Sequence, residues 1–572
     1  MKPPSLKLLQ KPLVLLLAAA FIVRFTGIWY GLPDLFNSDE PFNVANALSF
    51  GAKRSLEPTY FVYPTLYSYL LLVVYTFYFA AGKLFGAFDG VLDFGLAYFL
   101  NPTGLFFIGR LVSVFLGVFT IWLVYRIGER YFSKQAGLLA AALLAASVTH
   151  VDMSHWILVE PAVACSATLA LYFILRLYKR KGRVKECILA GIFVGLAIST
   201  KYNAGFVLIP LFVAVGMVFK SDPWKLFSRF AICGFCVLGG FLLASPYWLF
   251  SFSAFLYEFK YTVSHMSTGM VGHSSDIPLA WPVIEVLLKD WTVGVVFIAG
   301  LIYVFFQKRR KQLLLMTFAL PTLLVVGLWS RTGVHYLIPV FPALALLAAL
   351  FLLEINALVK NETVKISLLL ILFMPPVIKI VYQDLRLMQK DSRAIAKEWI
   401  EHNIPAGSVI AYENYVYGPN LFDPRRFLNN EFESRLLPLE IKEQLLQERN
   451  RRTSYLLVNL RKDFKTRLAG ETVEGDDSEG DPYIRQLFDL RLPKLRSLKK
   501  AKIEYLMISS DNYLRYFKGA VPRPGTALWF AYQNGKRFYE QVFQATGLTL
   551  LKEFSATRKK MGPTIRIYKI GV

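Results

Sequence analysis

Long apolar runs constrain what this chain can fold into more than any other feature of its sequence. Several runs reach the roughly 20 residues that a helix needs to cross the hydrocarbon core of a bilayer. The runs are continuous and do not alternate with polar residues, so they predict helices and not the strands of a membrane barrel. Only 18% of the 572 residues are charged, whereas about 25% are charged in soluble domains. We therefore predict a polytopic α-helical membrane protein.

The apolar runs end near residue 383 and divide the chain in two. Residues 1–383 are predicted to form a transmembrane domain, and residues 384–572 a soluble α/β domain. In the second part, SRAIAKEWIEHNIPAG has helical spacing and a proline and glycine stop. Residues 467–486 are rich in glycine and acidic residues, which is typical of a loop. Five short runs have the composition of strands: SVIAYE, SYLLVNL, EYLMISS, LTLLKEF and TIRIYKI.

The strong positive charge has a simple explanation in a membrane protein. A net charge of +24 can indicate a nucleic-acid partner, but here the Lys and Arg residues cluster in short loops between apolar runs. This is the pattern of cytoplasmic loops. The sequence contains no glycine-rich phosphate loop and no zinc-finger spacing. We expect no binding of nucleic acid.

The apolar run at 63–86 decides the predicted orientation. If it crossed the membrane, the basic loop RIGERYFSKQ at 126–135 and the later basic loops would lie outside, against the rule for such loops. We therefore predict that 63–86 dips into the outer face without crossing, which leaves about eleven transmembrane helices and an extracytoplasmic soluble domain. The predicted spans are 12–31, 106–127, 135–150, 160–177, 186–200, 203–219, 228–247, 286–306, 312–329, 335–353 and 364–382.

A small set of ionisable residues lies on the predicted outer side of the membrane. Such residues at a membrane boundary are candidates for a functional site. A carboxylate can take a proton from a hydroxyl as a general base, and cations can stabilise charge on a leaving phosphate. The set consists of Asp39, Glu40, Asp152, His155, Glu160, Lys201, His265, His273, Arg331 and His335.

Other interpretations of these residues remain open. Asp39 and Glu40 precede Pro41, and acidic residues also favour the first turn of an ordinary surface helix. Lys201 and Arg331 can equally extend to lipid head groups.

Several segments resemble a known family when they are read in order. SDEPFNVANAL and YPTLYSYLLL resemble the first external loop of the protein O-mannosyltransferases and lipid A aminoarabinose transferases, which are grouped as glycosyltransferase family 39 and have the GT-C fold. GRLVSVFLGVFTIWLVYRIGERYFSKQAGLLAAALLAAS is similar to their second and third spans, and SHWILVEP to their second external loop. STKYNAGFVLIP, HYLIPVFPALALLAA and DSRAIAKEWIEHNIPAGSVIAYE resemble later landmarks. The chain departs from the family at Glu160, where Asp is usual, and at His335, where Arg is usual.

The resemblance implies an inverting glycosyltransferase. It would move a sugar from a polyprenyl-phosphate donor in the bilayer to a hydroxyl of a glycolipid, polysaccharide or protein. By this resemblance Asp39 is the base, Glu40 supports it or binds the acceptor, and Glu160 is a second acid. The residues implied to bind the lipid phosphate or sugar are Lys201, Arg331, His335, Tyr336 and His273.

The resemblance also implies that no metal is obligatory, and a bacterial inner membrane is the expected location. A lipid or sugar transporter and a non-catalytic membrane assembly protein are the alternative functions. For the enzyme we expect Asp39, Glu160, Lys201 and Arg331 to converge on one cavity open to the lipid. If they lie apart, the assembly protein is favoured.

Overall fold

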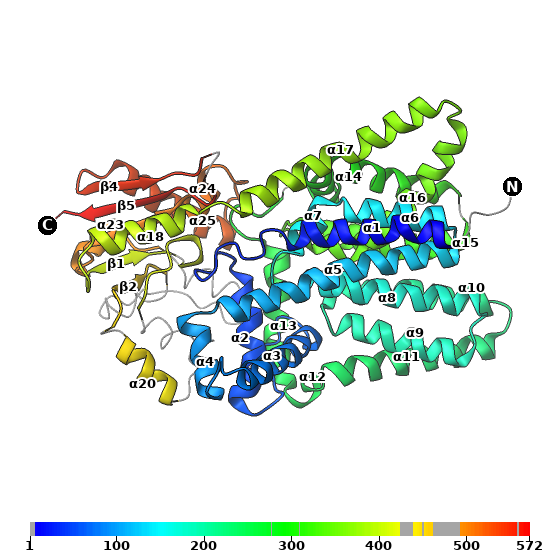
Figure 1. Ribbon diagram of the computed structural model, residues 1–572, viewed down its shortest axis with the longest axis horizontal. Helices are drawn as coiled ribbons and strands as arrows, with labels where there is room; N and C mark the ends of the chain where they lie inside the picture. Colours follow the sequence, from blue (N-terminus) through cyan, green and yellow to red (C-terminus); the bar gives the residue numbers. More distant parts are fainter. Residues whose placement is uncertain are drawn as a thin grey trace.

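The structure, a computed structural model, consists of a bundle of long helices and a smaller part built around a sheet at one end of the bundle (Figure 1). The predicted loop at 467–486 lies outside the described residues. Those residues are 6–275, 277–307, 309–413, 415–423, 439–448, 451–461, 492–557 and 560–571.

The bundle helices overlap all eleven predicted spans, and the predicted fold class is confirmed. Within the described part of the chain, nine helices are long and apolar enough to cross a membrane. They include α3, the segment predicted to dip, so the orientation of the chain in the membrane stays a prediction. The bundle is formed by α1 (Leu6–Phe25), α5 (Thr103–Tyr131), α6 (Lys134–Ala145), α7 (Val148–Met153), α8 (Val159–Lys179), α9 (Val184–Ile198), η1 (Tyr202–Val207), α10 (Leu208–Phe219), α11 (Pro223–Ala244), α14 (Trp281–Gln307), α15 (Arg310–Gly327), η2 (Val334–Val340), α16 (Phe341–Leu358) and α17 (Glu362–Leu387).

Glycines allow neighbouring bundle helices to approach closely. A Cβ added to Gly128 of α5 would lie 2.3 Å from the Cα of Gly137 in α6, and one added to Gly195 of α9 would lie 2.2 Å from the carbonyl oxygen of Val237 in α11. Neither contact leaves room for a side chain. The hydrophobic effect does not drive helices together in lipid. Small residues at such crossings allow the close van der Waals packing that stabilises the contact instead.

The predicted first external loop folds into three helices beside the sheet end of the bundle. They are α2 (Asp39–Lys53), α3 (Leu66–Leu84) and α4 (Val91–Leu100), and Figure 1 shows them at the same end of the bundle as the C-terminal part, below the sheet. Tyr67 and Leu71 of α3 pack with Phe106 of α5 in one buried cluster. Two further helices, α12 (Tyr247–Phe250) and α13 (Phe252–Thr268), follow α11.

The C-terminal part contains a mixed five-stranded sheet, as the strand patterns predict. The strand order is β2-β1-β3-β5-β4, with β2, β1 and β3 parallel and β5 antiparallel to both β3 and β4. The strands are β1 (Val409–Tyr412), β2 (Leu456–Asn459), β3 (Tyr505–Ser509), β4 (Leu548–Phe554) and β5 (Ile565–Ile570). The other elements are α18 (Ser392–Asn403), η3 (Tyr415–Tyr417), α20 (Leu439–Glu448), α23 (Leu495–Lys500), α24 (Ser510–Phe517) and α25 (Ala527–Gln544).

The central strand β3 is buried on both faces. Met507 packs with Ile400 of α18 on one face, and Leu506 packs with Tyr539 of α25 on the other. Successive side chains of a strand point to opposite faces, so helices are needed on both sides of a strand that is apolar throughout.

A buried ion pair fixes the C-terminal part against the chain just before α2. Arg393 donates to both carboxylate oxygens of Asp391, at 2.9 and 2.8 Å, and the Tyr30 hydroxyl donates to the same carboxylate. The Arg393 guanidinium carbon also lies 3.9 Å above the ring of Phe36. The predicted domain boundary at 383 falls inside α17, and the division into two domains stays a prediction.

Candidate functional site

Glu40, at the start of α2, is locked in a fully buried ion pair. Arg110 of α5 donates from Nε and Nη2 to the two carboxylate oxygens at 2.7 Å each, and neither side chain has any exposed surface. The backbone N–H of Ile157 donates to the same carboxylate at 3.0 Å. A bidentate pair of this kind fixes direction as well as distance. Glu40 is therefore fixed and buried, and its expected role as support for Asp39 or as an acceptor-binding group stays a prediction.

Asp39, the preceding residue, has a different environment. Solvent reaches its side chain, although protein surrounds it, and the Ser38 hydroxyl donates to it at 3.0 Å. Burial by the surrounding protein raises the pKa of the Asp39 carboxyl, and the negative charge of Glu160 raises it further. The positive charges of Lys201 and Arg331 oppose this rise in part. An accessible carboxylate with a raised pKa has the properties of a general base.

Glu160 and Lys201 form a second buried ion pair close to Asp39. Nζ of Lys201 lies 2.7 Å from Oε1 of Glu160, and both side chains are less than a tenth exposed. The same ammonium lies 5.4 Å from the ring centres of Tyr63 and Tyr336, within the range of cation–π attraction. Lys201 was expected to hold a phosphate, and in this structure a carboxylate neutralises much of its charge.

Arg331 supplies the other positive charge, and no carboxylate in the described part of the chain pairs with it. Its Nε donates to the Tyr336 hydroxyl at 2.8 Å, and Nη1 lies 2.6 Å from the sulfur of Met270. His335 contacts the Tyr336 ring, with centroids 4.0 Å apart, and lies near enough to Glu160 for their charges to interact.

His273 is part of the same group but does not provide a positive charge. Burial and the nearby cations Arg331, Arg515 and Lys289 lower its pKa to about 4. Its carbonyl accepts the N–H of Thr332 at 3.1 Å, so its loop is held beside Arg331. His273 is neutral near pH 7 and can act there only as a hydrogen-bonding group.

Seven of the eight predicted site residues therefore come together, and Glu40 is held separately by Arg110. Two other members of the wider set lie elsewhere, because His155 faces Asp384 of α17 at 3.5 Å and Asp152 belongs to the same surroundings. The seven residues that interact with one another are Asp39, Glu160, Lys201, His273, Arg331, His335 and Tyr336.

Two residues of the site were missed from the sequence. Tyr63 lies close to both acids, because the charges of Glu160 and Asp39 both act on its hydroxyl. Arg110 was detectable in principle, since a lone arginine in an apolar run is itself a signal of function.

The expectation that no metal is obligatory stays a prediction. Over the described ranges, no three His, Cys, Asp or Glu side chains form a group that could hold a metal ion, which leaves the metal dependence of any reaction undecided.

Comparison with known proteins agrees with the resemblance drawn from the sequence. Residues 103–250 match the family described as dolichyl-phosphate-mannose-protein mannosyltransferase. This range includes two of the segments that carry the resemblance, at 109–147 and 154–161. An uncharacterized protein of Aquifex aeolicus (strain VF5) is 26% identical over 255 residues, which are 44% of this chain and 49% of that protein. The chain thus matches about half the length of this relative.

Solved structures were also compared with this chain. The oligosaccharyltransferase AglB from Archaeoglobus fulgidus, in complex with an inhibitory peptide and a dolichol-phosphate, has a TM-score of 0.54 at 15% identity, over 91% of this chain and 72% of that one. ArnT from Cupriavidus metallidurans, bound to undecaprenyl phosphate, has a TM-score of 0.47 at 14% identity, over 97% of both chains. The similarity to AglB confirms the predicted GT-C fold.

Proposed function

We propose that this chain is an inverting glycosyltransferase of the GT-C fold that transfers a sugar from a polyprenyl-phosphate donor to a hydroxyl of a glycan, lipid or protein. The observation that carries the proposal is the convergence of the Asp39 carboxylate with the cations Lys201 and Arg331. An accessible base and fixed positive charges in one place suit the departure of a phosphate and the activation of a hydroxyl.

In the proposed reaction Asp39 acts as the base. The acceptor hydroxyl gives its proton to the Asp39 carboxylate while its oxygen forms a bond to the anomeric carbon of the sugar. The bond from that carbon to the phosphate oxygen breaks, and the polyprenyl phosphate leaves with the electron pair. Attack from the face opposite the phosphate inverts the anomeric centre.

Arg331 is the main binding group for the phosphate in this proposal. It is the cation of the site that lacks a carboxylate partner within the described residues, and the Tyr336 hydroxyl at 2.8 Å orients its guanidinium. A guanidinium fork matches the oxygens of a phosphate in pairs. Lys201, held by Glu160 at 2.7 Å, is proposed to contribute a second, partly neutralised charge beside it.

The donor class rests on the resemblance. The AglB structure of the same fold contains a dolichol-phosphate, which is a lipid carrier of the proposed kind. We propose that the reaction takes place at the extracytoplasmic face of a bacterial inner membrane, and that it needs no obligatory metal because the two cations of the site can receive the phosphate.

A transfer assay tests this function. The full chain in lipid nanodiscs is given a panel of radiolabelled polyprenyl-phosphate sugars, with membrane extracts as the acceptor. We expect transfer from at least one donor and a loss of about 100-fold or more in Asp39→Asn. Asp93→Asn, which removes an exposed acid of α4, is the matched control. Absence of transfer from every donor, or near-normal transfer by Asp39→Asn, contradicts the proposal.

A further inference from the structure

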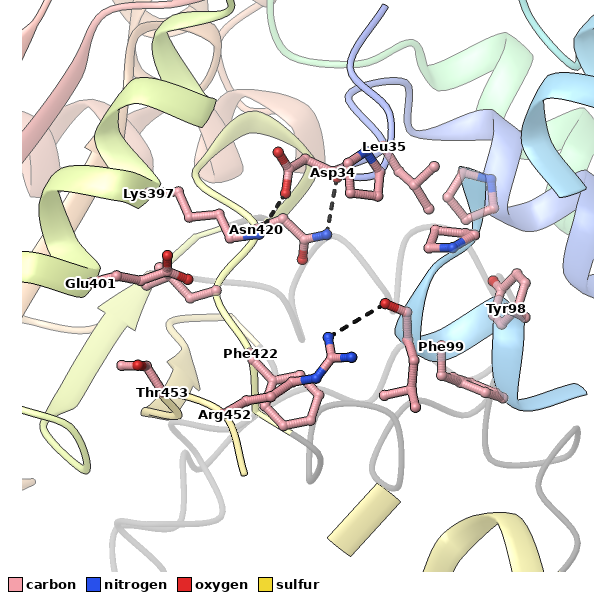
Figure 2. A pocket seen from close by; sticks show the side chains of 15 residues that line it. Asp34, Leu35, Tyr98, Phe99, Lys397, Glu401, Asn420, Phe422, Arg452 and Thr453 are labelled. Atoms are coloured by element: carbon pink, nitrogen blue, oxygen red, sulfur yellow. Dashed lines mark hydrogen bonds and ion pairs between the residues drawn. The ribbon is translucent and has the colours of Figure 1, made fainter. Parts of the chain in front are cut away.

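A cavity of about 400 Å³ lies between α4 and the C-terminal part of the chain, apart from the group around Asp39. Figure 2 shows Lys397 and Glu401 of α18 on one side of it, Tyr98 and Phe99 of α4 on the other, and Phe422 below. The volume falls in the range of about 300–1,000 Å³ that is usual for small-molecule sites. Because its two sides come from different parts of the chain, the cavity exists only when these parts are docked.

We infer that this cavity binds a sugar unit of the acceptor and forms a glycan subsite beside the catalytic group. That the bound sugar belongs to the acceptor rests on the function proposed above. That a sugar binds here rests on the chemistry of the cavity alone.

Glu401 is an acidic group of the cavity that a ligand can use. Lys397 is paired with Asp34 at 2.8 Å, and Arg452 shares Glu448 with Arg451, each at 3.1 Å. Glu401 has no hydrogen bond or ion pair with any described residue. A hydroxyl or an ammonium group of a ligand can donate to its carboxylate.

The remaining surface of the cavity suits the two kinds of surface that a sugar presents. Phe422, which is partly exposed, provides an apolar ring, against which the C–H face of a pyranose can pack. The rings of Tyr98 and Phe99 are almost completely buried and form the wall behind it. Glu401 and the Thr453 hydroxyl provide hydrogen-bonding groups for the ring hydroxyls. A hydrocarbon chain would leave these polar groups without partners at a cost in free energy, so a lipid tail is disfavoured.

The cavity lies across the start of α2 from the proposed base. Pro41 lines the cavity, and Asp39 is two residues earlier in the same first turn. Successive helical residues are rotated by about 100°, so the two side chains leave the helix on nearly opposite faces. Asp34 and Leu35, just before α2, also line the cavity. A glycan held here can pass over the start of α2 and present a hydroxyl to Asp39.

Saccharide binding to the full chain in nanodiscs, without any donor, tests the subsite. Saturation-transfer NMR is recorded with tetrasaccharides of glucose, mannose, galactose and glucosamine. We expect at least one to bind, with affinity about 10-fold weaker in Glu401→Gln and binding lost in Thr453→Trp, whose indole fills the cavity. Glu398→Gln, on the same helix but paired with Lys390 at 2.6 Å, is the control and should bind as the unaltered protein does. Thermal unfolding of each variant checks that it is folded.

The outcomes separate this inference from the proposed function. If none of the four saccharides binds, or if Glu401→Gln and Thr453→Trp bind as tightly as the unaltered protein, the subsite is wrong even where sugar transfer is observed. If a saccharide binds and both variants lose it while no donor is ever turned over, the subsite stands and the proposed transfer reaction fails.

Discussion

The ammonium of Lys201 lies 2.7 Å from the carboxylate of Glu160, and both side chains are buried. The pair joins the first turn of α8 to the residue that precedes η1. The charge of Lys201 that could act on a bound phosphate is therefore partly neutralised by Glu160. Glu160 is best understood as the residue that positions Lys201, while Asp39 remains the accessible carboxylate of the site.

Replacing Glu160 by Gln should impair both stability and turnover. Removing one partner leaves the buried charge of Lys201 uncompensated, which costs about 3–5 kcal/mol in the free energy of unfolding. Glu160→Asp keeps the charge and should retain part of the activity. Adding Lys201→Met to Glu160→Gln should restore stability but not turnover, because the unpaired charge disappears. Denaturant unfolding and the transfer assay measure the two effects, and a double variant no more stable than Glu160→Gln would contradict the pairing.

The pH dependence of transfer should report the pKa of Asp39. Burial and the charge of Glu160 raise this pKa, and the base acts only when it is deprotonated, so kcat/KM should fall as the pH is lowered through the raised pKa. In Glu160→Gln the neighbouring negative charge is gone, and the acid limb should move to lower pH. An acid limb that stays in place in this variant would show that another group controls it.

The same shift predicts that Asp39→Asn is more stable than the unaltered protein at neutral pH. Because the pKa is higher in the folded state, the folded protein binds more protons than the unfolded chain, and stability falls as the pH rises from the unfolded pKa through the folded one. Asn does not titrate and removes this loss. The unfolding midpoint should rise at pH 7 and show little gain at pH 3. Equal midpoints at pH 7 would argue against a raised pKa.

The strands were predictable because each is a short run rich in apolar and β-branched residues, although β4 is largely exposed in the structure. EYLMISS, which becomes β3, is apolar without alternation, as expected for a strand with helices on both faces. Whether α3 crosses the membrane could not be predicted from its own residues. Its composition fits a span and a dipping helix equally well, and only the charges of distant loops distinguish the two.

The sequence was enough to predict at which depth in the membrane the site residues lie, but not which residues form ion pairs with one another. Loop charges placed Asp39, Glu160 and Lys201 at one level of the membrane, and the structure brings them together. The partner of Glu40 was not predictable from spacing, because Arg110 is 70 residues away in the sequence and lies in an apolar run. Only the folded chain shows that the adjacent acids have different environments.

The Glu40–Arg110 pair should be essential for stability, in contrast to exposed pairs. Both side chains are completely buried, so Glu40→Gln should lower the free energy of unfolding by about 3–5 kcal/mol. The matched control is Glu129→Gln, which breaks a partly exposed pair with Arg126 and should cost less than about 1 kcal/mol. Denaturant unfolding in nanodiscs measures both. A cost for Glu40→Gln as small as that of the control would contradict a structural role for the pair.

Arg331 should determine how tightly the site holds a polyprenyl phosphate, the product that leaves in the proposed reaction. Its guanidinium, oriented by Tyr336, has no carboxylate competitor among the described residues, so Arg331→Met should weaken inhibition by added undecaprenyl phosphate about 10- to 100-fold, the value of one or two charge-assisted hydrogen bonds. Arg331→Lys keeps the charge but lacks the forked guanidinium, so its inhibition by undecaprenyl phosphate should be intermediate between that of Arg331→Met and that of the unaltered protein. Arg54→Met, which removes an exposed cation at the end of α2, is the control for general surface charge. If Arg331→Met is inhibited as strongly as the unaltered protein, the phosphate is held elsewhere, and Lys201 becomes the residue to test.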